Sequence, residues 1–330
     1  MKKFNKKFLS DYDSNHIILT YPIMHESRHD FREFERIYNE LLFILTNNKI
    51  DITMVVSNKK DFDSQIQKEI LDQIKIIQHN CNDIWIRDYC PKVKLVHENN
   101  IFIKYKYNGY GNKYAHQKDN LLKDVLAKDS NCIDIEGFFL EGGNIEISSS
   151  GTLLTNIQAI MKNNSCNKNE IMSKLNNLKK HLNLSEMYFI ETEGIVGDDT
   201  NGHIDNLIRF INNDTVLYMS SIDKNYINYH LLKDVYKQLK KIQEKSLTIK
   251  NLIEIRHDEN DILQDDDKIY PYSKLNFLMT KKNIVFPCIK TNQKIINKSI
   301  SKLKLRNISF IECEATLKEY GGLHCLSANL

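Results

Sequence analysis

Apolar residues along the chain recur at two spacings, one typical of helices and the other typical of strands. Between residues 29 and 46 they return every three or four positions, which predicts an amphipathic helix. The short apolar runs Ile17–Thr20 and Ile52–Val56 instead predict strands. A second helix is expected over Asp61–Leu71, with Asp61 as its N-cap. Because helices and strands alternate to the end of the chain, the expected fold class is mixed α/β.

A unit of one helix, one strand, a turn and a strand pair recurs along the rest of the chain. The helices of these units are expected over residues 116–127, 168–182, 227–243 and 291–304. The strands that follow them are expected at Cys132–Ile135, Met187–Ile190, Leu252–Ile255 and Ile308–Ile311. The strand pairs are expected at Ile145–Ile147 with Thr152–Thr155, His203–Phe210 with Thr215–Met219, and Leu275–Thr280 with Asn283–Phe286. Such a repeat predicts a closed arrangement of units rather than two domains.

The two ends of the chain complete this arrangement. The last unit lacks a closing strand, and the first strand, Ile17–Thr20, lacks a partner before it. Pairing a strand at His324–Ala328 with Ile17–Thr20 closes a ring of five units, with Trp85–Asp88 and Ile101–Tyr105 in the remaining place. Radial closure leaves no long sheet edge exposed. We therefore predict one α/β domain over 1–330, with pseudo-five-fold units around a central site and a polar N-terminal extension over 1–15.

Composition excludes several functional classes. The 46 basic and 43 acidic residues give a net charge of only +3, which argues against a nucleic-acid-binding or membrane-binding surface. The seven cysteines are odd in number and scattered, without a CxxC pair, so neither a disulfide framework nor a zinc site is expected. The basic start of the chain lacks the apolar segment of a signal peptide, and no stretch approaches the ~20 apolar residues of a membrane span. We expect a cytoplasmic protein with free thiols.

Four stretches contain residues suited to chemistry. The first holds the single tryptophan, Trp85, followed by Arg87, Asp88 and Pro91. A carboxylate beside an aromatic wall suits a planar cation, whereas the alternative is a structural Arg–Asp ion pair under an aromatic core residue. The second stretch places Glu141 after an apolar run and before two glycines, either at the inner end of a strand or in a surface turn.

The third stretch contains His203 and Asp205, which lie two residues apart and so face the same side of an expected strand. A histidine beside a carboxylate can act as a general acid and base. The alternative is a hydrogen-bonded structural histidine, and a zinc site would need further ligands. The fourth stretch ends in Cys325, directly after Gly322-Leu323-His324. Its thiol is either a small buried hydrophobe or a nucleophile at the mouth of a cleft.

Taken together, these residues limit the kinds of substrate that the site can suit. A Cys–His pair alone also fits proteases and transferases. Three carboxylates do not suit an amide substrate, because attack on an amide generates an oxyanion that needs hydrogen-bond donors. They suit a guanidinium, which is a flat cation with five N–H donors.

Four motifs then carry a resemblance to known proteins. They are Trp85-Ile86-Arg87-Asp88 with Pro91, Glu141-Gly142-Gly143, Gly202-His203-Ile204-Asp205 and Gly322-Leu323-His324-Cys325. Together they resemble the guanidine-modifying superfamily, and most of all the agmatine deiminases of the bacterial peptidylarginine-deiminase-like group. The resemblance runs from His16 to Leu330. Two departures, Cys90 in place of a small residue and the ending Leu326–Ala328, concern the pocket for the substrate tail rather than the core roles.

The resemblance implies a five-bladed α/β-propeller, the pentein fold. The catalytic residues that it implies are Cys325, His203, Asp88, Asp205 and Glu141. The substrate-binding residues that it implies are Trp85, Asp88, Asp205, Asp198 and Gly322. In these roles Cys325 is the nucleophile and His203 the acid and base. Asp198 or its neighbour Asp199 would contact the substrate amine, and a solvated turn is the alternative for these two acids.

The implied reaction is hydrolytic deimination of agmatine to N-carbamoylputrescine and ammonia through an S-amidino-cysteine intermediate, in support of putrescine and polyamine synthesis. It needs no metal and no organic cofactor. Two alternatives stay open: deimination of free or peptidyl arginine, and a catalytically silent binding protein on the same scaffold. The acidic pair Asp198-Asp199 favours agmatine, because an arginine enzyme needs a cation for the α-carboxylate. The resemblance also implies a homo-oligomer without nucleic-acid or membrane partners.

Overall fold

The computed structural model describes residues 7–22, 31–96, 99–266, 268–289 and 307–330. Within these ranges the strands form five sheets of three or four strands and one two-stranded hairpin. The first sheet has the order β18-β1-β2-β3, formed by Ser327–Asn329, His16–Thr20, Asp51–Val56 and Ile74–Gln78. The hairpin consists of β13 (Leu263–Asp265) and β14 (Lys268–Tyr270).

The other four sheets have three strands each, in chain order. Their strands are β4 (Lys92–Val96), β5 (Asn99–Lys106) and β6 (Asn131–Phe139); β7 (Glu146–Ile147), β8 (Thr152–Asn156) and β9 (Glu186–Ile190); β10 (Ile208–Phe210), β11 (Thr215–Ser220) and β12 (Asn251–Arg256); and β15 (Leu278–Met279), β16 (Asn283–Cys288) and β17 (Asn307–Glu312). In all five sheets one strand pairs antiparallel on one side and parallel on the other. The mixed α/β class and the recurring unit are therefore confirmed.

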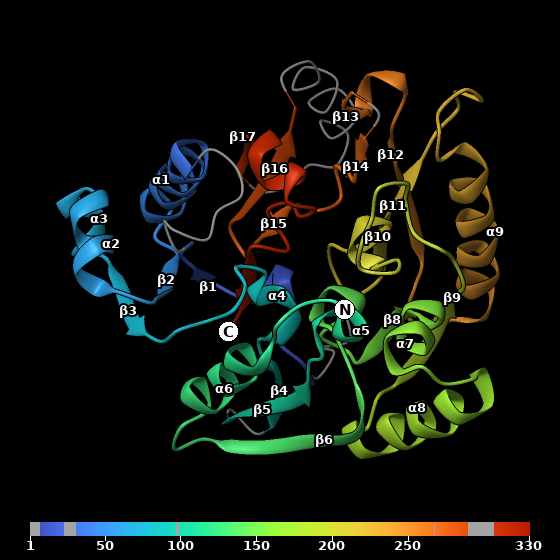
Figure 1. Cartoon of the computed structure of the whole chain (residues 1–330). Helices are drawn as coiled ribbons and strands as arrows, with labels where there is room; N and C mark the ends of the chain where they lie inside the picture. The colour runs from blue at the N-terminus through green and yellow to red at the C-terminus, as the bar shows by residue number, and fades with distance from the viewer. Residues whose placement is uncertain (1–6, 23–30, 97–98, 267, 290–306) are drawn as a thin grey trace.

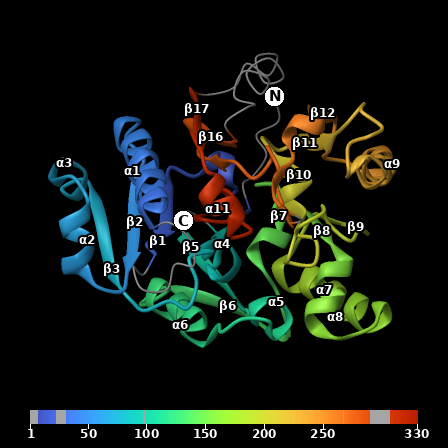
Figure 2. The same cartoon turned by 45° about the horizontal axis from the view of Figure 1, so that its top comes forward.

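Most of the longer helices cover the outside of these sheets, and Figures 1 and 2 both place α1, α6, α8 and α9 at the periphery. The helices are α1 (Phe31–Asn47), α2 (Lys59–Gln65), α3 (Lys68–Leu71), α4 (Ile86–Tyr89), α5 (Gly109–Asn112), α6 (Gln117–Leu126), α7 (Ile157–Asn164), α8 (Lys168–Leu182), α9 (Tyr229–Lys245) and α11 (Glu314–Lys318). Four 3-10 turns are η1 (Asp11–Asp13), η2 (Gly142–Asn144), η3 (Ile204–Asn206) and η4 (Glu259–Asp261).

The pairing expected between the two ends of the chain is confirmed. β1 pairs antiparallel with β18, in a register that sets Ile17 opposite Asn329 and Leu19 opposite Ser327. The strand is shorter than expected, because residues 324–326 form a turn before it. The C-terminus consequently lies in the middle of the molecule, beside β1 and α4 (Figure 1).

Several expected elements differ in detail. The helix expected over Asp61–Leu71 is divided into α2 and α3, and the N-cap of α2 is Asn58, whose side chain accepts from the Lys60 N–H. Trp85–Asp88, which was given a place in the remaining unit without a helix being predicted there, leads into and forms most of α4. His203 and Asp205 belong to turn η3 and not to a strand, because the strand begins only at Ile208. The helix expected over 291–304 lies outside the described residues.

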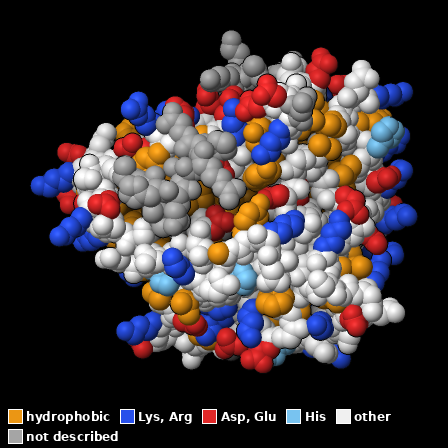
Figure 3. Space-filling model, viewed as in Figure 1, with side chains coloured by type: hydrophobic (Ala, Val, Ile, Leu, Met, Phe, Trp, Pro, Cys, Tyr) orange, Lys and Arg blue, Asp and Glu red, His pale blue; other side chains and the backbone are white. Residues whose placement is uncertain are grey.

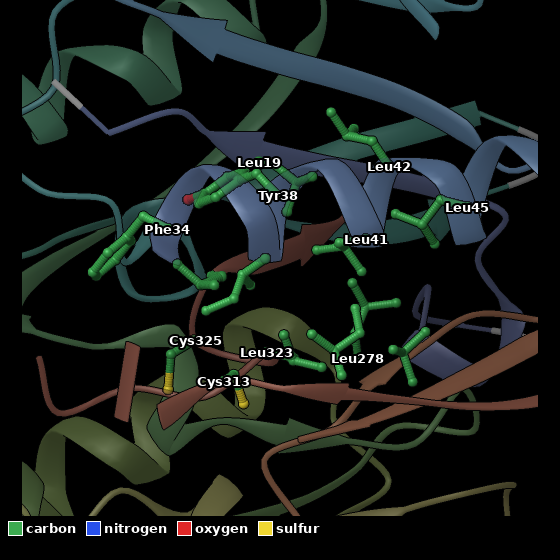
Figure 4. Packing of buried hydrophobic residues seen from close by; sticks show 14 of the residues in the cluster. Leu19, Phe34, Tyr38, Leu41, Leu42, Leu45, Leu278, Cys313, Leu323 and Cys325 are labelled. Atoms are coloured by element: carbon green, nitrogen blue, oxygen red, sulfur yellow. The ribbon is translucent and has the colours of Figure 1, made fainter. Parts of the chain in front are cut away.

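Helix α1 shows how the amphipathic pattern is used. Its buried residues, Phe34, Ile37, Tyr38, Leu41, Leu42 and Leu45, lie on one face, as the spacing predicts. They pack in a core cluster that also contains Leu278, Leu323 and Cys325 (Figure 4). The outer face of the helix carries the exposed Phe43 and charged residues. Packing of α1 therefore holds the backbone that carries the C-terminal cysteine.

The N-terminal stretch differs from the polar extension expected over 1–15. Phe8 and Tyr12 are only 1% and 4% exposed, and Phe8 pairs as an isolated bridge with Lys94. The carboxylate of Asp11, in η1, forms ion pairs with Arg87 and Arg209. Residues 7–15 are thus a packed part of the fold, whereas residues 1–6 lie outside the described part.

The surface matches the small net charge. Figure 3 shows Lys and Arg side chains interspersed with Asp and Glu over the visible face. None of the helices in the described ranges is long and apolar enough to cross a membrane.

We expect Phe8→Ala to lower the free energy of unfolding by about 3 kcal/mol, because truncation of a buried phenylalanine leaves a cavity. Phe43→Ala is the matched control, since Phe43 is 58% exposed, and it should cost less than about 0.5 kcal/mol. Denaturant unfolding measures both values. Equal, small losses in the two variants would show that the N-terminal stretch does not pack as described.

Candidate active site

The site residues come from the turns that lead into the first strand of each sheet. Asp88 precedes β4, Glu141 precedes β7, Asp205 precedes β10 and Cys325 precedes β18. Turn η2 contacts both α4 and η3, so the turns meet in one place. Residues separated by more than two hundred positions in the sequence therefore share one buried centre.

Helix α4 presents Asp88 to this centre. The helix is short because Pro91 follows it, and Cys90 adopts the extended conformation (φ −71°, ψ 137°) that a residue before proline favours. Asp88 is 1% exposed. Its Oδ1 accepts from the Gly143 N–H at 2.8 Å, and its Oδ2 accepts from the Tyr110 hydroxyl at 2.8 Å. Both oxygens are thereby held in a fixed orientation.

The Glu-Gly-Gly motif brings Glu141 to His203. Nε2 of His203 lies 2.8 Å from Oε2 of Glu141, and Nδ1 lies 3.5 Å from Oδ1 of Asp88. A Cβ atom on Gly143 would lie only 2.6 Å from His203 Nδ1 and 2.9 Å from Asp88 Oδ1. Only glycine therefore allows the three side chains to approach one another in this way.

Electrostatics hold His203 in its protonated form. Burial alone lowers its pKa, but the carboxylates of Asp88, Glu141 and Asp205 raise the pKa of His203 to about 10. Burial raises the pKa of Glu141, while the hydrogen bond with His203 acts in the opposite direction. At neutral pH the ring is thus an imidazolium that can donate a proton.

Cys325 lies close to Asp205 and is 7% exposed. Its Sγ lies 3.8 Å from Oδ2 of Asp205. Burial, and then the negative charges of Asp205 and Asp88, raise the pKa of the Cys325 thiol well above its usual value. Near neutral pH the thiol is therefore protonated unless a cation enters between the carboxylates.

Asn276, which sequence reasoning missed, supports the same cysteine. Its Nδ2 lies 3.1 Å from the Cys325 Sγ, and its Oδ1 accepts from the backbone N–H groups of His324 and Cys325 at 3.1 and 3.2 Å. A Cβ on Gly322 would lie 2.7 Å from this oxygen, so the glycine is needed for the contact with Asn276. Gly322, like Asp205 and His203, is not among the described residues that line the cavity, so its expected substrate contact stays a prediction.

A cavity of about 430 Å³ opens onto Cys325 and Asp88. Trp85 forms part of its wall and is packed so closely against Gly321 that a Cβ there would lie 2.2 Å from the indole ring. Among the described residues that line the cavity there is no lysine or arginine, and four are acidic: Asp83, Asp88, Asp199 and Glu319. The cavity therefore suits a cationic ligand.

The two adjacent acids of the Asp-Asp turn have different surroundings. The oxygens of Asp198 accept from the Thr200 hydroxyl and the Gly202 N–H, which closes the turn. Asp198 is not among the described lining residues, whereas Asp199 lines the cavity and accepts from the Tyr114 hydroxyl at 3.0 Å. Burial, with the charge of Asp198, raises the pKa of Asp199 to about 6. Of the two acids considered for a substrate amine, the structure therefore presents Asp199.

The described part of the chain contains no group of three or more His, Cys, Asp or Glu side chains arranged to hold a metal ion. The fold itself is that of known deiminases. A substrate-bound agmatine deiminase of C. jejuni superposes with a TM-score of 0.85 at 23% identity, covering 100% of this chain and 97% of that one.

A family model described as Porphyromonas-type peptidyl-arginine deiminase matches residues 12–330. The chain belongs to this family, so the predicted resemblance to deiminases is confirmed. A protein of Lactococcus lactis named "Putative agmatine deiminase" is 24% identical over 306 residues, covering 84% of this chain and 81% of that protein. A protein of the same name from Legionella pneumophila is 26% identical over 290 residues, covering 84% and 80%.

We expect Asn276→Ala to slow alkylation of Cys325 by iodoacetamide about ten-fold or more at a given pH, because a hydrogen bond to a charged group is worth about 1.5–3 kcal/mol. The loss would raise the thiol pKa further, so the rate profile should move to higher pH. Peptide-resolved mass spectrometry measures the rate, with the exposed Cys132 as an internal reference. An unchanged Cys325 rate relative to Cys132 would contradict the role of Asn276.

Proposed function

We propose that the protein is an agmatine deiminase with the five-bladed α/β-propeller architecture of the penteins, a single domain, located in the cytoplasm and assembled as a homo-oligomer. The observation that carries the activity is the arrangement around Cys325: its buried thiol lies 3.8 Å from Asp205 Oδ2 and lines the same cavity as Asp88, whose carboxylate lies 3.5 Å from His203 Nδ1. Two carboxylates opposite one another can each accept from a guanidinium, and they leave its central carbon between them and the sulfur. The names of the relatives favour agmatine among the guanidines.

In the first half-reaction the guanidinium enters between Asp88 and Asp205. Its positive charge stabilises the Cys325 thiolate, whose proton is released to solvent. The sulfur attacks the guanidinium carbon and a C–S bond forms. The C–N bond to the terminal nitrogen then breaks as His203 donates its proton, and ammonia departs. Cys325 is left as an S-amidino adduct and His203 as a neutral imidazole.

In the second half-reaction the neutral His203 takes a proton from water. The hydroxide attacks the amidino carbon, a C–O bond forms, and the C–S bond breaks. The proton on the new oxygen is released, the ureido product leaves, and the thiolate is protonated again. Glu141 holds the imidazole in orientation through its contact with Nε2 in both half-reactions. Agmatine and water thereby give N-carbamoylputrescine and ammonia.

The cavity favours a substrate that ends in an amine. An α-carboxylate would meet the acidic lining residues without a lysine or arginine among the described ones, whereas an ammonium would be attracted to them. Peptidyl arginine remains the second candidate, because the family model that matches the chain is described by that substrate.

The test is a panel of agmatine, free arginine and an arginyl peptide, with ammonia and ureido product both measured. We expect agmatine to give the highest kcat/KM. A preference for the peptide would replace agmatine by the second candidate, and an absence of turnover on all three would leave a silent binding protein.

Cys325→Ala should abolish turnover while agmatine binding, measured by calorimetry, stays within about three-fold, because the carboxylates that hold the guanidinium are unchanged. Cys132→Ala is the matched control, since that thiol is exposed and lies outside the site. Residual ammonia release by the Cys325 variant would contradict its role as nucleophile.

Asp199→Asn should raise the KM for agmatine about ten-fold, because the amine loses a partly buried counter-charge. Butylguanidine, which has the same guanidinium and no amine, should show an unchanged KM and serves as the control substrate. Since the pKa of Asp199 is raised to about 6, the KM of the unaltered enzyme for agmatine should also rise as the pH falls through that value. Equal changes for both substrates would remove Asp199 from the amine site.

A further inference from the structure

A second histidine, His324, directly precedes Cys325 and contacts Asp205. Nδ1 of His324 lies 2.6 Å from Oδ2 of Asp205, the same oxygen that lies 3.8 Å from the Cys325 sulfur. Nε2 of His324 lies 2.9 Å from Oδ2 of Asp11. A continuous line therefore runs from the sulfur through Asp205 and His324 to the N-terminal turn.

Asp11 is fixed at the far end of this line by two arginines. Its Oδ1 lies 3.2 Å from Nη1 of Arg87, and its Oδ2 lies 2.9 Å from Nη2 of Arg209. Both guanidiniums are buried, at 2% and 0% exposed, and each also bonds to other parts of the fold, so neither is free to turn. The Asp11 carboxylate is thereby held rigidly toward His324.

Building on the proposed deiminase activity, we propose that Asp11 and His324 are positioning residues, which hold the Asp205 carboxylate in the orientation that faces the guanidinium and Cys325. Among the described residues, the only side-chain hydrogen bonds to Asp205 are the short one with His324 and the long, weak one with Cys325 Sγ, and Oδ1 of Asp205 has no partner there. Without His324 the carboxylate could rotate about its Cα–Cβ bond. A rotation of this kind misplaces the guanidinium relative to the sulfur, and small misplacements of reacting groups cost up to about 100-fold in rate.

The number of protons on His324 depends on both acids that it contacts, Asp11 and Asp205. Although burial alone raises the pKa of Asp11, the charges of Arg87, His324 and Arg209 hold it well below its usual value. Burial alone also raises the pKa of Asp205, but its hydrogen bond with His324 and the charges of His324, His203 and Arg209 together lower it. Two ionised carboxylates can only accept, so His324 can donate to both of them only in the form that carries a proton on each ring nitrogen.

Burial and the guanidiniums of Arg209 and Arg87 lower the pKa of His324, whereas the two acids act in the opposite direction. The net result is a lowered pKa, so the second ring proton is weakly held and depends on the negative charges of Asp11 and Asp205. The titratable and charged groups around this line, from every element packed against it, are Asp11, Arg87, Asp88, Lys92, Glu146, His203, Asp205, Arg209, His324 and Cys325.

Glu146 provides a matched control for Asp11. Its Oε1 lies 2.6 Å from Nε of Arg209, so it is a second carboxylate on the same arginine. Its other oxygen accepts from the Phe210 N–H, and within the described part of the chain Glu146 forms no hydrogen bond or ion pair with His324 or Asp205. A structural effect through Arg209 should therefore appear in both Asp11→Asn and Glu146→Gln, whereas an effect through His324 should appear only in the first.

The first experiment compares these two variants with the unaltered protein. We expect Asp11→Asn to lower kcat/KM for agmatine about ten-fold or more, and Glu146→Gln less than about two-fold, at similar losses of thermal stability. In parallel, nitrogen NMR of histidine-labelled protein follows the titration of His324. Its pKa should fall by about one unit or more in Asp11→Asn, where an ionised acceptor is lost, and should change much less in Glu146→Gln.

The second experiment changes His324 itself. In His324→Leu the donor to Asp205 is lost, so the pKa of Asp205 rises. The acidic limb of the pH profile of kcat/KM should therefore move up by about one pH unit. His324→Asn should recover a large part of the activity, because its amide nitrogen can donate to Asp205 from a position close to that of Nδ1. A merely structural role would leave the acidic limb in place in both variants.

The outcomes separate this inference from the proposed function. Equal kinetic and NMR effects of Asp11→Asn and Glu146→Gln would overturn the positioning role while the deiminase activity stands. If the unaltered protein turned over none of the three guanidines, the proposed function would fail. The NMR comparison would then still decide whether Asp11 controls the proton on His324. An unchanged His324 titration in Asp11→Asn would contradict the inference.

Discussion

Burial of like charges in one place is the constraint on which the rest of this structure depends. Asp88, Glu141 and Asp205 are all nearly inaccessible to solvent, and each ionised carboxylate removed from water costs several kcal/mol unless it is paired. His203 supplies one positive charge, shared between Glu141 and Asp88. The centre therefore favours a further cation, and a guanidinium between Asp88 and Asp205 would supply both the charge and the N–H donors. Affinity for the substrate and activation of the thiol then have the same electrostatic cause.

The arginines behind the site are also buried charges, and they too need partners of opposite charge. Arg87 and Arg209 are buried cations, and Asp11 pairs with both while Glu146 pairs with Arg209. Arg87 stands one residue before Asp88, but its ion pair is with Asp11 and not with its neighbour in the sequence. The arginine is used for structure, through Asp11, and the aspartate faces the cavity.

Much of the fold was predictable because it repeats. The amphipathic spacing of residues 31–47 matches the single buried face of α1, and the continuous apolar runs of β1 and β2 match strands that are buried at nearly every position. The site residues were predictable because Asp88, Glu141, His203, Asp205 and Cys325 are chemically unusual side chains in glycine-rich turns. The local conformation of these turns was not predictable: His203 and Asp205 were assigned to a strand, yet tertiary contacts with Glu141 and His324 hold them in a 3-10 turn.

Residues whose role depends on partners far away along the chain could not be predicted from the sequence. Nothing in the polar stretch before β1 distinguishes Asp11 from a solvated acid, because its partners come from α4, β10 and the C-terminal turn. Asn276 could be recognised only by its position in the repeat. It stands two residues before β15, as Cys325 stands two residues before β18, so the repeat itself marks the position in the fifth unit.

The pairing of β18 with β1 helps to fix the position of Cys325, because the cysteine lies in the turn directly before β18. The pairing of Ser327–Asn329 with β1 anchors this turn on one side, and Asn276 holds the His324 and Cys325 N–H groups on the other. The Arg87 N–H donates to the Cys325 carbonyl at 3.2 Å, which joins the turn to the residue beside Asp88. Cys325 is thus as firmly placed as a residue in a core strand, because segments from the N-terminal, middle and C-terminal parts of the sequence all bond to the same backbone turn.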